Sequence, residues 1–292
     1  MLSQNLKLIP SYTQNKKPST DKTVPYLFFH IPKSAGMSLF IGLGSGFHHG
    51  KDRLSFPYIV SRIDDEKKDS DVLSSLTDFF VEHKSKDVGG IIASHIPNKV
   101  LNSANTRFKF ITVLRDPIDR VMSAFTYDCM RNDIIPTSIL LNDFVKKQDN
   151  QDVMTKTLLG INTIKGGEGV VSANMVKESF YAYCFVSDLN ELIESLITES
   201  GLPNIVLGSE NQTLEKFKYK GTESDRQLIA SMNKEDVELV NEIGFGSKNI
   251  PAYEKTKNIS DRTVKVMGDQ TSSKYNGESA LYKTEDLLKS AV

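Results

Sequence analysis

The stretch that decides the fold is Val24-Pro-Tyr-Leu-Phe-Phe-His-Ile-Pro-Lys-Ser-Ala-Gly-Met-Ser-Leu-Phe40. Its first eight residues are mostly apolar or aromatic, which is typical of a buried strand, and Pro32 ends that strand. Small residues follow and lead into an apolar helix start. A strand, a tight turn and a helix in this order form a phosphate-binding layout. The turn directs backbone N–H groups at one point, and the helix N-terminus adds partial positive charge.

The turn supplies the groups that bind a phosphate. Lys33 brings a full positive charge, Ser34 and Ser38 have hydroxyls that can donate, and Gly36 permits close backbone approach. The order is not that of Walker A, Gly-x-x-x-x-Gly-Lys-Ser/Thr, because Lys33 precedes the glycine by three residues. From these residues alone, a phosphate site and an ordinary tight strand–helix turn both fit.

A second segment, Leu114-Arg-Asp-Pro-Ile-Asp-Arg-Val-Met-Ser-Ala-Phe125, also joins a strand to a helix. Asp116 and Pro117 are a typical N-cap and first-turn pair. Arg115 stands at the strand edge, where open α/β sheets bind ligands, and Ser123 lies about two turns along the helix. This pair can hold a second phosphate. The alternative is a helix-capping Asp116 with a surface Arg115.

The remaining periodicity predicts one α/β domain. Apolar runs favour further strands at 88–95, 108–114, 180–186 and 205–207, and helical spacing favours helices within 61–87, from 117 through 127, at 189–199, and twice after 223. Strands separated by helices imply crossover connections and a mostly parallel central sheet flanked by helices. We expect an arm at 1–23, a domain at 24–246 with a P-loop-like strand–loop–helix, and a polar tail at 247–292.

Composition excludes several classes of protein. In 292 residues, 36 Lys and Arg oppose 37 Asp and Glu, so no overall positive field exists to hold nucleic acid or an anionic membrane. Two cysteines, Cys129 and Cys184, are too few for a disulfide scaffold or a zinc site of three or four thiolates. No stretch approaches 18 apolar residues, and the N-terminus lacks a signal-peptide pattern. We expect a cytoplasmic protein without a metal.

The two motifs together resemble those of a known family. Phe29-His-Ile-Pro-Lys-Ser-Ala-Gly-Met-Ser-Leu39 resembles the 5′-phosphosulfate loop of sulfotransferases, and Leu114-Arg-Asp-Pro-Ile-Asp-Arg-Val-Met-Ser123 resembles their 3′-phosphate motif. The subgroup that the chain resembles most is the heparan-sulfate 2-O-sulfotransferase type with its bacterial relatives, which use 3′-phosphoadenosine 5′-phosphosulfate (PAPS) and release PAP. The similarity runs from about residue 24 to 245. It includes Asp149-Asn-Gln-Asp-Val-Met-Thr-Lys-Thr-Leu-Leu-Gly160, which resembles the subgroup's Asp-Asn-x-x-x-Arg-x-x-x-Gly stretch.

The resemblance implies roles for individual residues. Lys33 would hold the phosphosulfate bridge, and Arg115 with Ser123 would bind the 3′-phosphate. The 5′-phosphate would be wrapped, largely by backbone N–H groups, by Ser34, Ala35, Gly36, Met37 and Ser38. The chain departs from the family at Met37, where Thr is usual. The lost hydroxyl removes one donor, which would lower the affinity for PAPS; Met37 faces either the acceptor or the core.

Sulfonate transfer to an alcohol also needs a base, and His is a natural one. His95 ends a predicted strand at the same sheet edge as Lys33 and Arg115, and it matches the Gly-His position of the resembling subgroup, whose His is the base. The alternative for His95 is a hydrogen bond to a neighbouring loop, and the rival bases are His48 and His49, read as loop residues. His30 is expected in the core and His83 in solvent. By resemblance, Asn150 and Gln151 lie on the acceptor side, whereas Arg120 is expected in a surface ion pair.

These readings predict an enzyme that moves sulfonate from PAPS to a hydroxyl, or an amine, of a small-molecule, natural-product or carbohydrate acceptor. One alternative is a P-loop-type ATP-dependent kinase, against which the missing Walker A and Walker B motifs count. Another is a non-catalytic nucleotide-binding module, which Met37 favours and Lys33, His95 and Arg115 oppose. The tail at 247–292 is expected to be dispensable for PAP binding.

Overall fold

The structure, a computed structural model, describes residues 24–50, 57–83, 88–103, 107–159, 171–202, 204–207, 214–252 and 263–266. The predicted arm at 1–23 and most of the predicted tail lie outside the described residues. Within the described ranges, no helix combines the length and the apolar character needed to cross a bilayer.

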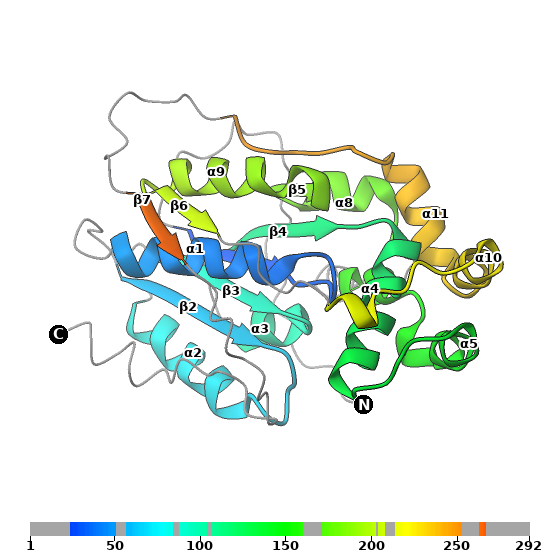
Figure 1. Ribbon diagram of the computed structural model, residues 1–292. Coiled ribbons are helices and arrows are strands. Elements are labelled where there is room, and N and C mark those ends of the chain that lie inside the picture. Colours follow the sequence, from blue (N-terminus) through cyan, green and yellow to red (C-terminus); the bar gives the residue numbers. More distant parts are fainter. Residues whose placement is uncertain are drawn as a thin grey trace, which may run out of the picture.

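A five-stranded sheet lies at the centre of the molecule (Figure 1), in the order β2-β3-β1-β4-β5. Every pairing in it is parallel. The strands are β1 (Tyr26–Phe29), β2 (Tyr58–Ile63), β3 (Gly89–Ser94), β4 (Lys109–Leu114) and β5 (Ala182–Phe185). The predicted α/β class with a parallel sheet flanked by helices is therefore confirmed.

Helices cover both faces of the sheet, which is why its central strand is apolar throughout. All four residues of β1 are buried; Tyr26 and Phe28 pack into one apolar cluster, and Leu27 and Phe29 into the other. The first cluster includes α1 (Gly36–Gly50) and α9 (Leu189–Glu199). The second includes α2 (Ser70–Glu82), α3 (Pro97–Ser103), α6 (Val153–Leu158), α8 (Ala173–Ser179) and α11 (Lys234–Ile243).

A third apolar cluster joins helices beyond the ends of the strands. It is formed by α4 (Pro117–Arg131), α5 (Ser138–Lys146) and α10 (Glu223–Met232), which lie where the strand arrows point (Figure 1). Its buried members include Phe125, Leu141 and Ile229. Two short 3₁₀ turns, η2 (Gln148–Asn150) and η4 (Glu215–Phe217), flank this helical group, and a third, η3 (Val186–Asp188), precedes α9. The carboxyl ends of the strands therefore face a layer of helices.

The structure differs from the prediction in three strands. Residues 58–63 form β2, an edge strand whose residues are only half-buried except Ile63, and the helix expected within 61–87 begins at Ser70. The predicted strand near 205 exists as β6 (Asn204–Leu207), but it does not join the central sheet. It pairs in parallel with β7 (Thr263–Val266), which the sequence places in the polar tail.

Candidate active site at the carboxyl end of the sheet

The segment from Lys33 to Ser38 contains the end of the turn between β1 and α1 and the first residues of α1, and its backbone is unusual. Lys33 and Ala35 adopt φ values of 69° and 56°, a left-handed conformation that side chains rarely take and that costs about 1–3 kcal/mol each. Among the described residues, no hydrogen bond engages the backbone amides of Lys33, Ala35, Gly36 or Met37. Successive free amides in such a turn form a concavity that favours an anion.

Ser34 gives this loop a polar group without a partner. Its side chain is only 1% exposed, and its Oγ has no hydrogen-bond partner within the described part of the chain. Buried hydroxyls in native proteins are nearly always hydrogen-bonded, so an orphaned one requires an explanation. An anion held by the loop would supply the missing acceptor.

Two cations that lie 82 residues apart in the sequence meet at this loop. Arg115 donates from Nη1 to the carbonyl oxygen of Lys33 at 2.9 Å, and Lys33 Nζ lies 3.9 Å from the centre of the Tyr127 ring. Burial, and then the charge of Arg115, lowers the pKa of Lys33, while burial also lowers the pKa of Arg115. Two partly desolvated cations side by side favour a ligand with more than one negative charge.

Ser123 lies on the same helix as Tyr127, four residues before it. Positions four apart share a helix face, so Ser123 is directed to the side of α4 that Tyr127 and Lys33 occupy. The helix starts as predicted: the Asp116 side chain accepts from the Asp119 amide at 2.9 Å, and Pro117 follows. Ser123 is half-buried, and among the described residues no hydrogen bond joins it to Arg115.

Gly36 and Met37 have identifiable neighbours. A Cβ on Gly36 would lie 2.2 Å from Cδ2 and 2.6 Å from Nε2 of His30, so only glycine fits between the helix start and that ring. The sequence left open whether Met37 faces the acceptor or the core. In the structure, Arg62 Nη1 donates a hydrogen bond to its sulfur at 3.0 Å. The Met37 side chain therefore contacts the end of β2.

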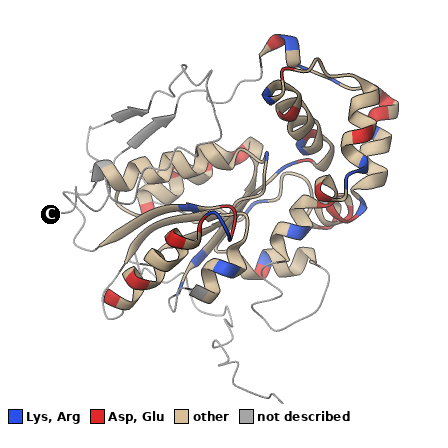
Figure 2. Ribbon diagram, turned by 90° about the horizontal axis from the view of Figure 1, so that it is seen from below, with Lys and Arg blue, Asp and Glu red and all other residues tan. Residues whose placement is uncertain are grey.

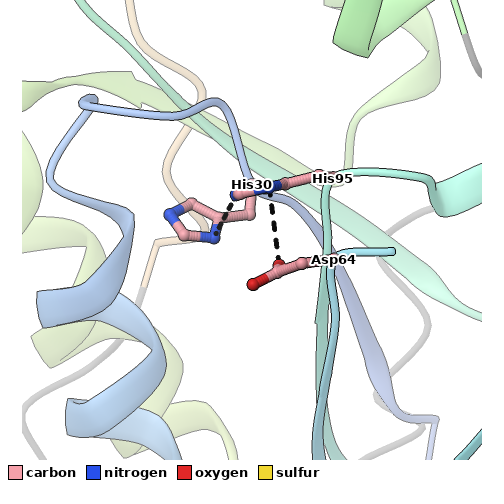
Figure 3. Close-up of side chains that lie close together, drawn as sticks. All are labelled: His30, Asp64 and His95. Atoms are coloured by element: carbon pink, nitrogen blue, oxygen red, sulfur yellow. Dashed lines mark hydrogen bonds and ion pairs between the residues drawn. The ribbon is translucent and has the colours of Figure 1, made fainter. Parts of the chain in front are cut away.

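His95 is the middle member of a chain of three side chains (Figure 3). Its Nε2 lies 3.2 Å from Nδ1 of His30, and its Nδ1 lies 3.6 Å from Oδ1 of Asp64. Burial lowers the pKa of both imidazoles; His95, Arg62 and Lys33 lower that of His30 further, and Asp64 opposes the shift of His95. Both rings are therefore neutral near pH 7, the state in which an imidazole can act as a base.

The same three side chains do not form a ready metal cage. Their nearest donor atoms lie within 4.8 Å of one another, but Asp64 and His30 meet different nitrogens of His95. A tetrahedral zinc ion bound at about 2.0–2.1 Å would require ligand atoms roughly 3.3 Å apart around one point. His95 is hydrogen-bonded to His30 and lies in looser contact with Asp64, and the three side chains would have to move to surround an ion.

A pocket of about 490 Å³ adjoins the loop and His95. Its lining residues come from the ends of β1 and β3 and from the segment of η2 and α6: Pro32, His95, Gln148, Asp149, Val153, Lys156 and Thr157. Figure 2 shows Lys and Arg positions on several of the loops between the sheet and the neighbouring helices. Of the residues predicted for the site, His95 lines this pocket and none from Lys33 to Ser38 does; Pro32, directly before Lys33, is the nearest lining residue in sequence.

Asn150 and Gln151, the acceptor-side candidates, turn away from this pocket. Their side-chain amides donate to the carbonyl oxygens of Phe144 at 2.7 Å and Val145 at 2.9 Å, which fixes the η2 segment to α5. Their neighbours Gln148 and Asp149 line the pocket instead.

Three other sequence expectations need correction. Arg120 is 2% exposed and lies 3.8 Å from the buried Asp236, so its ion pair is internal and not on the surface. His48 and His49 belong to the last turns of α1, not to a loop, and His48 is about 18 Å along the helix from Gly36. His83 hydrogen-bonds the Phe79 carbonyl oxygen at 2.8 Å at the end of α2.

Sequence reasoning missed several residues of the site: Arg62, Asp64, Tyr127, Asp149, Lys156 and Thr157. A signal existed for Asp64, because it directly follows a segment rich in β-branched residues, Tyr58–Ile63, that is a strand. Tyr127 is an exposed aromatic on α4 at helical spacing from Ser123, which a face-by-face reading of that helix would have found. The pocket residues of α6 lie within the stretch 149–160 quoted above, which pointed to this segment but did not single them out.

Neither a protein-family model nor a curated protein sequence matches this chain. A function must therefore be argued from the loop, the two cations and the pocket.

Proposed function

We propose that this protein is a PAPS-dependent sulfotransferase acting on a hydroxyl, or an amine, of a small-molecule, natural-product or carbohydrate acceptor. The observation that carries the proposal is the loop around Ser34: a buried hydroxyl without a partner, in a turn whose free amides lie beside Lys33 and Arg115. A bound anion would satisfy both the hydroxyl and the free amides, which supports the proposal.

The residues of the loop fit a phosphosulfate. In this proposal β1, the loop and α1 form a P-loop-like unit in which Ser34, Ala35, Gly36, Met37 and Ser38 hold the 5′-phosphate. Lys33 would hold the phosphosulfate bridge, and Arg115 with Ser123 would bind the 3′-phosphate. PAPS, when bound, supplies an activated sulfonate. The contact of Arg115 with the Lys33 carbonyl supports this division, because it keeps the two phosphate subsites adjacent.

The chemistry then requires a proton acceptor and a positive charge on opposite sides of sulfur. The acceptor oxygen forms a bond to sulfur as the bond from sulfur to the bridging oxygen breaks, and the acceptor proton passes to His95. Lys33 stabilises the negative charge that develops on the departing phosphate of PAP, as in phosphoryl transfer. The pocket supports this arrangement, because His95 lines it next to Pro32, the residue before Lys33.

The pocket lining also indicates the character of the acceptor. Gln148, Asp149, Lys156 and Thr157 offer donors and acceptors of hydrogen bonds, and only Val153 and Pro32 are apolar. The exposed wall of the pocket is nonetheless more apolar than polar, so an acceptor with both hydroxyls and an apolar face matches it.

The test measures binding and turnover separately. Calorimetric titration with PAP and with ATP, followed by detection of PAP release from PAPS in an acceptor screen, should show PAP binding and acceptor-dependent release. Lys33→Ala should abolish turnover. Arg115→Ala should weaken PAP binding by about 10- to 150-fold, because one charge-assisted contact contributes about 1.5–3 kcal/mol. Lys234→Ala, an exposed change on α11, is the matched control.

The same measurements separate the alternatives. ATP binding with phosphoryl transfer and no affinity for PAP would assign a kinase. PAP binding without release from PAPS for any acceptor would assign a non-catalytic nucleotide-binding module. His95→Ala should lower kcat by about 10²–10⁴-fold and leave PAP affinity unchanged, because removal of a general base has an effect of that size.

A further inference from the structure

We infer that Asp64 and His30 are positioning residues that hold His95 in one tautomer, with the proton on Nδ1 and the lone pair on Nε2. The catalytic consequence rests on the function proposed above, whereas the tautomer itself does not.

The sheet register brings the three side chains into one row. Ser94 of β3 pairs with Ile63 of β2 on one side and with Phe29 of β1 on the other. The next residue of each strand is His95, Asp64 and His30, respectively. Three adjacent parallel strands therefore present carboxylate, imidazole and imidazole side by side at their carboxyl ends, as Figure 3 shows.

The carboxylate decides which nitrogen of His95 carries the proton. An ionised Asp64 can only accept, and its Oδ1 lies 3.6 Å from Nδ1 of His95. A lone pair on Nδ1 would face that negative charge, so the favourable neutral form has Nδ1–H toward Asp64. Oδ1 is buried and has no hydrogen-bond partner among the described residues, which leaves His95 as the group that it faces.

On the other side, His30 can complete the same tautomer as a hydrogen-bond donor. When the lone pair of His95 is on Nε2, Nδ1 of His30 at 3.2 Å must be the donor. This distance is at the long end of the range for N–H donors, and the two rings are tilted by 48° with centres 4.6 Å apart. The contact orients His95, and the hydroxyl of an arriving acceptor can replace it.

In the row Asp64–His95–His30, neighbouring groups favour a charge at Asp64 and none at His30. Arg62 Nη2 contacts Oδ2 of Asp64 at 2.5 Å, which holds the carboxylate in place. His30 is 4% exposed and stays neutral, since burial and the nearby cations disfavour its protonation. Among the described residues, the charged and titratable groups near His95 are Asp64, which follows β2, and Arg62, which lies within β2. The others are His30 and Lys33, which follow β1, and Asp149 and Lys156, which line the pocket with His95.

The tautomer can be read directly on the full chain. Long-range ¹⁵N–¹H correlation of the imidazoles should show His95 with its proton on Nδ1 in the wild-type protein. Asp64→Asn should turn this into a mixture of tautomers or the Nε2–H form, and Asp71→Asn, an exposed carboxylate in the first turn of α2, should change nothing. A wild-type His95 with its proton on Nε2 would overturn the inference.

Kinetics provide a second readout. Asp64→Asn should lower kcat at least tenfold at unchanged PAP affinity and unchanged KM for PAPS. The acid limb of its kcat profile should move to lower pH, because the carboxylate raises the pKa of His95; Arg62→Gln should move that limb to higher pH. If Asp64→Asn acted only by disturbing the structure, PAP affinity and Tm would fall together and the acid limb of the kcat profile would stay in place.

The role of His30 is tested by a pair of variants. His30→Asn keeps a side-chain N–H donor near the position of Nδ1 and should retain more kcat than His30→Leu, which keeps none. Equal losses in both variants would remove His30 from the inference. If the wild-type protein releases no PAP from PAPS, the proposed function fails, but the NMR result still decides the tautomer. If the protein releases PAP from PAPS but His95 carries its proton on Nε2, this inference is refuted and the proposed function stands.

Discussion

A substitution at Ser34 should have opposite effects on the stability of the ligand-free protein and on PAP binding. Its hydroxyl is buried without a partner among the described residues, and such a group destabilises the ligand-free protein by about 1–3 kcal/mol. Ser34→Ala should therefore raise the free energy of unfolding without ligand by about 1 kcal/mol and weaken PAP binding several-fold. Urea denaturation and calorimetry measure the two quantities. Ser231→Ala on α10 is an exposed control, and a Ser34 variant with unchanged PAP affinity would show that the hydroxyl does not face the ligand.

The buried His30 should make the free energy of unfolding depend on pH. Its folded-state pKa is well below the ordinary value of 6.5 because of burial, so the unfolded chain binds a proton more readily. The stability is therefore fully present above about pH 6.5 and is lost as the pH falls toward the folded pKa, by up to about 1.4 kcal/mol per pH unit for one group.

Denaturant unfolding between pH 7 and 5 tests this slope. His30→Asn should make it shallower, whereas His48→Gln, at the other end of α1, should not. An unchanged slope in the His30 variant would place the pH dependence on other groups, His95 first, since its pKa is also lowered.

The sequence predicted which residues form the motifs, but it could not predict the contacts between one motif and another. Lys33 and Arg115 were found because each follows a recognisable strand and precedes a helix. The hydrogen bond between them depends on the pairing of β1 with β4, which no local pattern states. Asp64 was missed for a similar reason: a lone carboxylate in a charged segment gains meaning only from the register that places it beside His95.

At the scale of elements, the floor of the pocket depends on one buried carboxylate. Asp236 of α11 accepts from the backbone amides of Met154 at 3.1 Å and Thr155 at 2.8 Å, at the start of α6, and lies 3.8 Å from Nε of Arg120 on α4. Arg120 also donates to the Asn150 carbonyl oxygen at 3.2 Å. Three helices and η2 thus meet at this buried pair, and α6 carries three of the pocket residues.

Asp236→Asn should lower the free energy of unfolding by about 3–5 kcal/mol, because it leaves the buried Arg120 charge without its counterion. The variant should also raise the KM for the acceptor while PAP affinity stays unchanged, since α6 lines the pocket and not the loop. Urea unfolding and steady-state kinetics provide both values, with the exposed Glu235→Gln as control. A loss below 1 kcal/mol would mean that the pair contributes little.

The elements that sequence analysis predicted are those with the strongest burial. Strands β1, β3 and β4 are buried on both faces and read as apolar runs, so their periodicity could not be mistaken for a surface helix. The edge strand β2 contains Ser61 and Arg62 and is half-buried, which hides it in a charged region. The next residues form a turn, because the Asp69 carboxylate accepts from the amides of Asp64 and Asp65 at 2.7 and 2.9 Å, and this turn delays α2.

At the scale of the whole molecule, strand order creates the site. β1 lies between β3 and β4, so the loops after all three strands meet at one edge. Sequence analysis predicted that His95, Lys33 and Arg115 share this edge, as parallel strands require. It did not give the order 2-3-1-4-5, because packing of helices on both faces selects among the possible orders, and those contacts join residues far apart in the sequence.

The chain beyond residue 246 is also part of the packed structure. Tyr183 of β5 and Asn249 exchange two backbone hydrogen bonds of 2.9 Å, and Ser195 of α9 donates to the Pro251 carbonyl oxygen at 2.6 Å. Ile250 packs on the apolar cluster beneath α1 and α9, and Lys248 pairs with Asp188 at 2.9 Å. The expected tail therefore begins with six residues that lie along the edge of the sheet.

These contacts predict different outcomes for two truncations. A chain ending at residue 246 loses the three hydrogen bonds named above, at about 1 kcal/mol each, together with the Ile250 contact and the side-chain bonds of Lys248 and Asn249, so its Tm should fall by roughly 5–15 °C. A chain ending at residue 252 keeps them, and it should bind PAP as the full chain does, since every residue proposed to hold PAP lies between 33 and 123. Differential scanning calorimetry with and without PAP compares the two. Equal Tm values would make residues 247–252 dispensable, and loss of PAP binding in the longer chain would mean that residues after 252 support the nucleotide site.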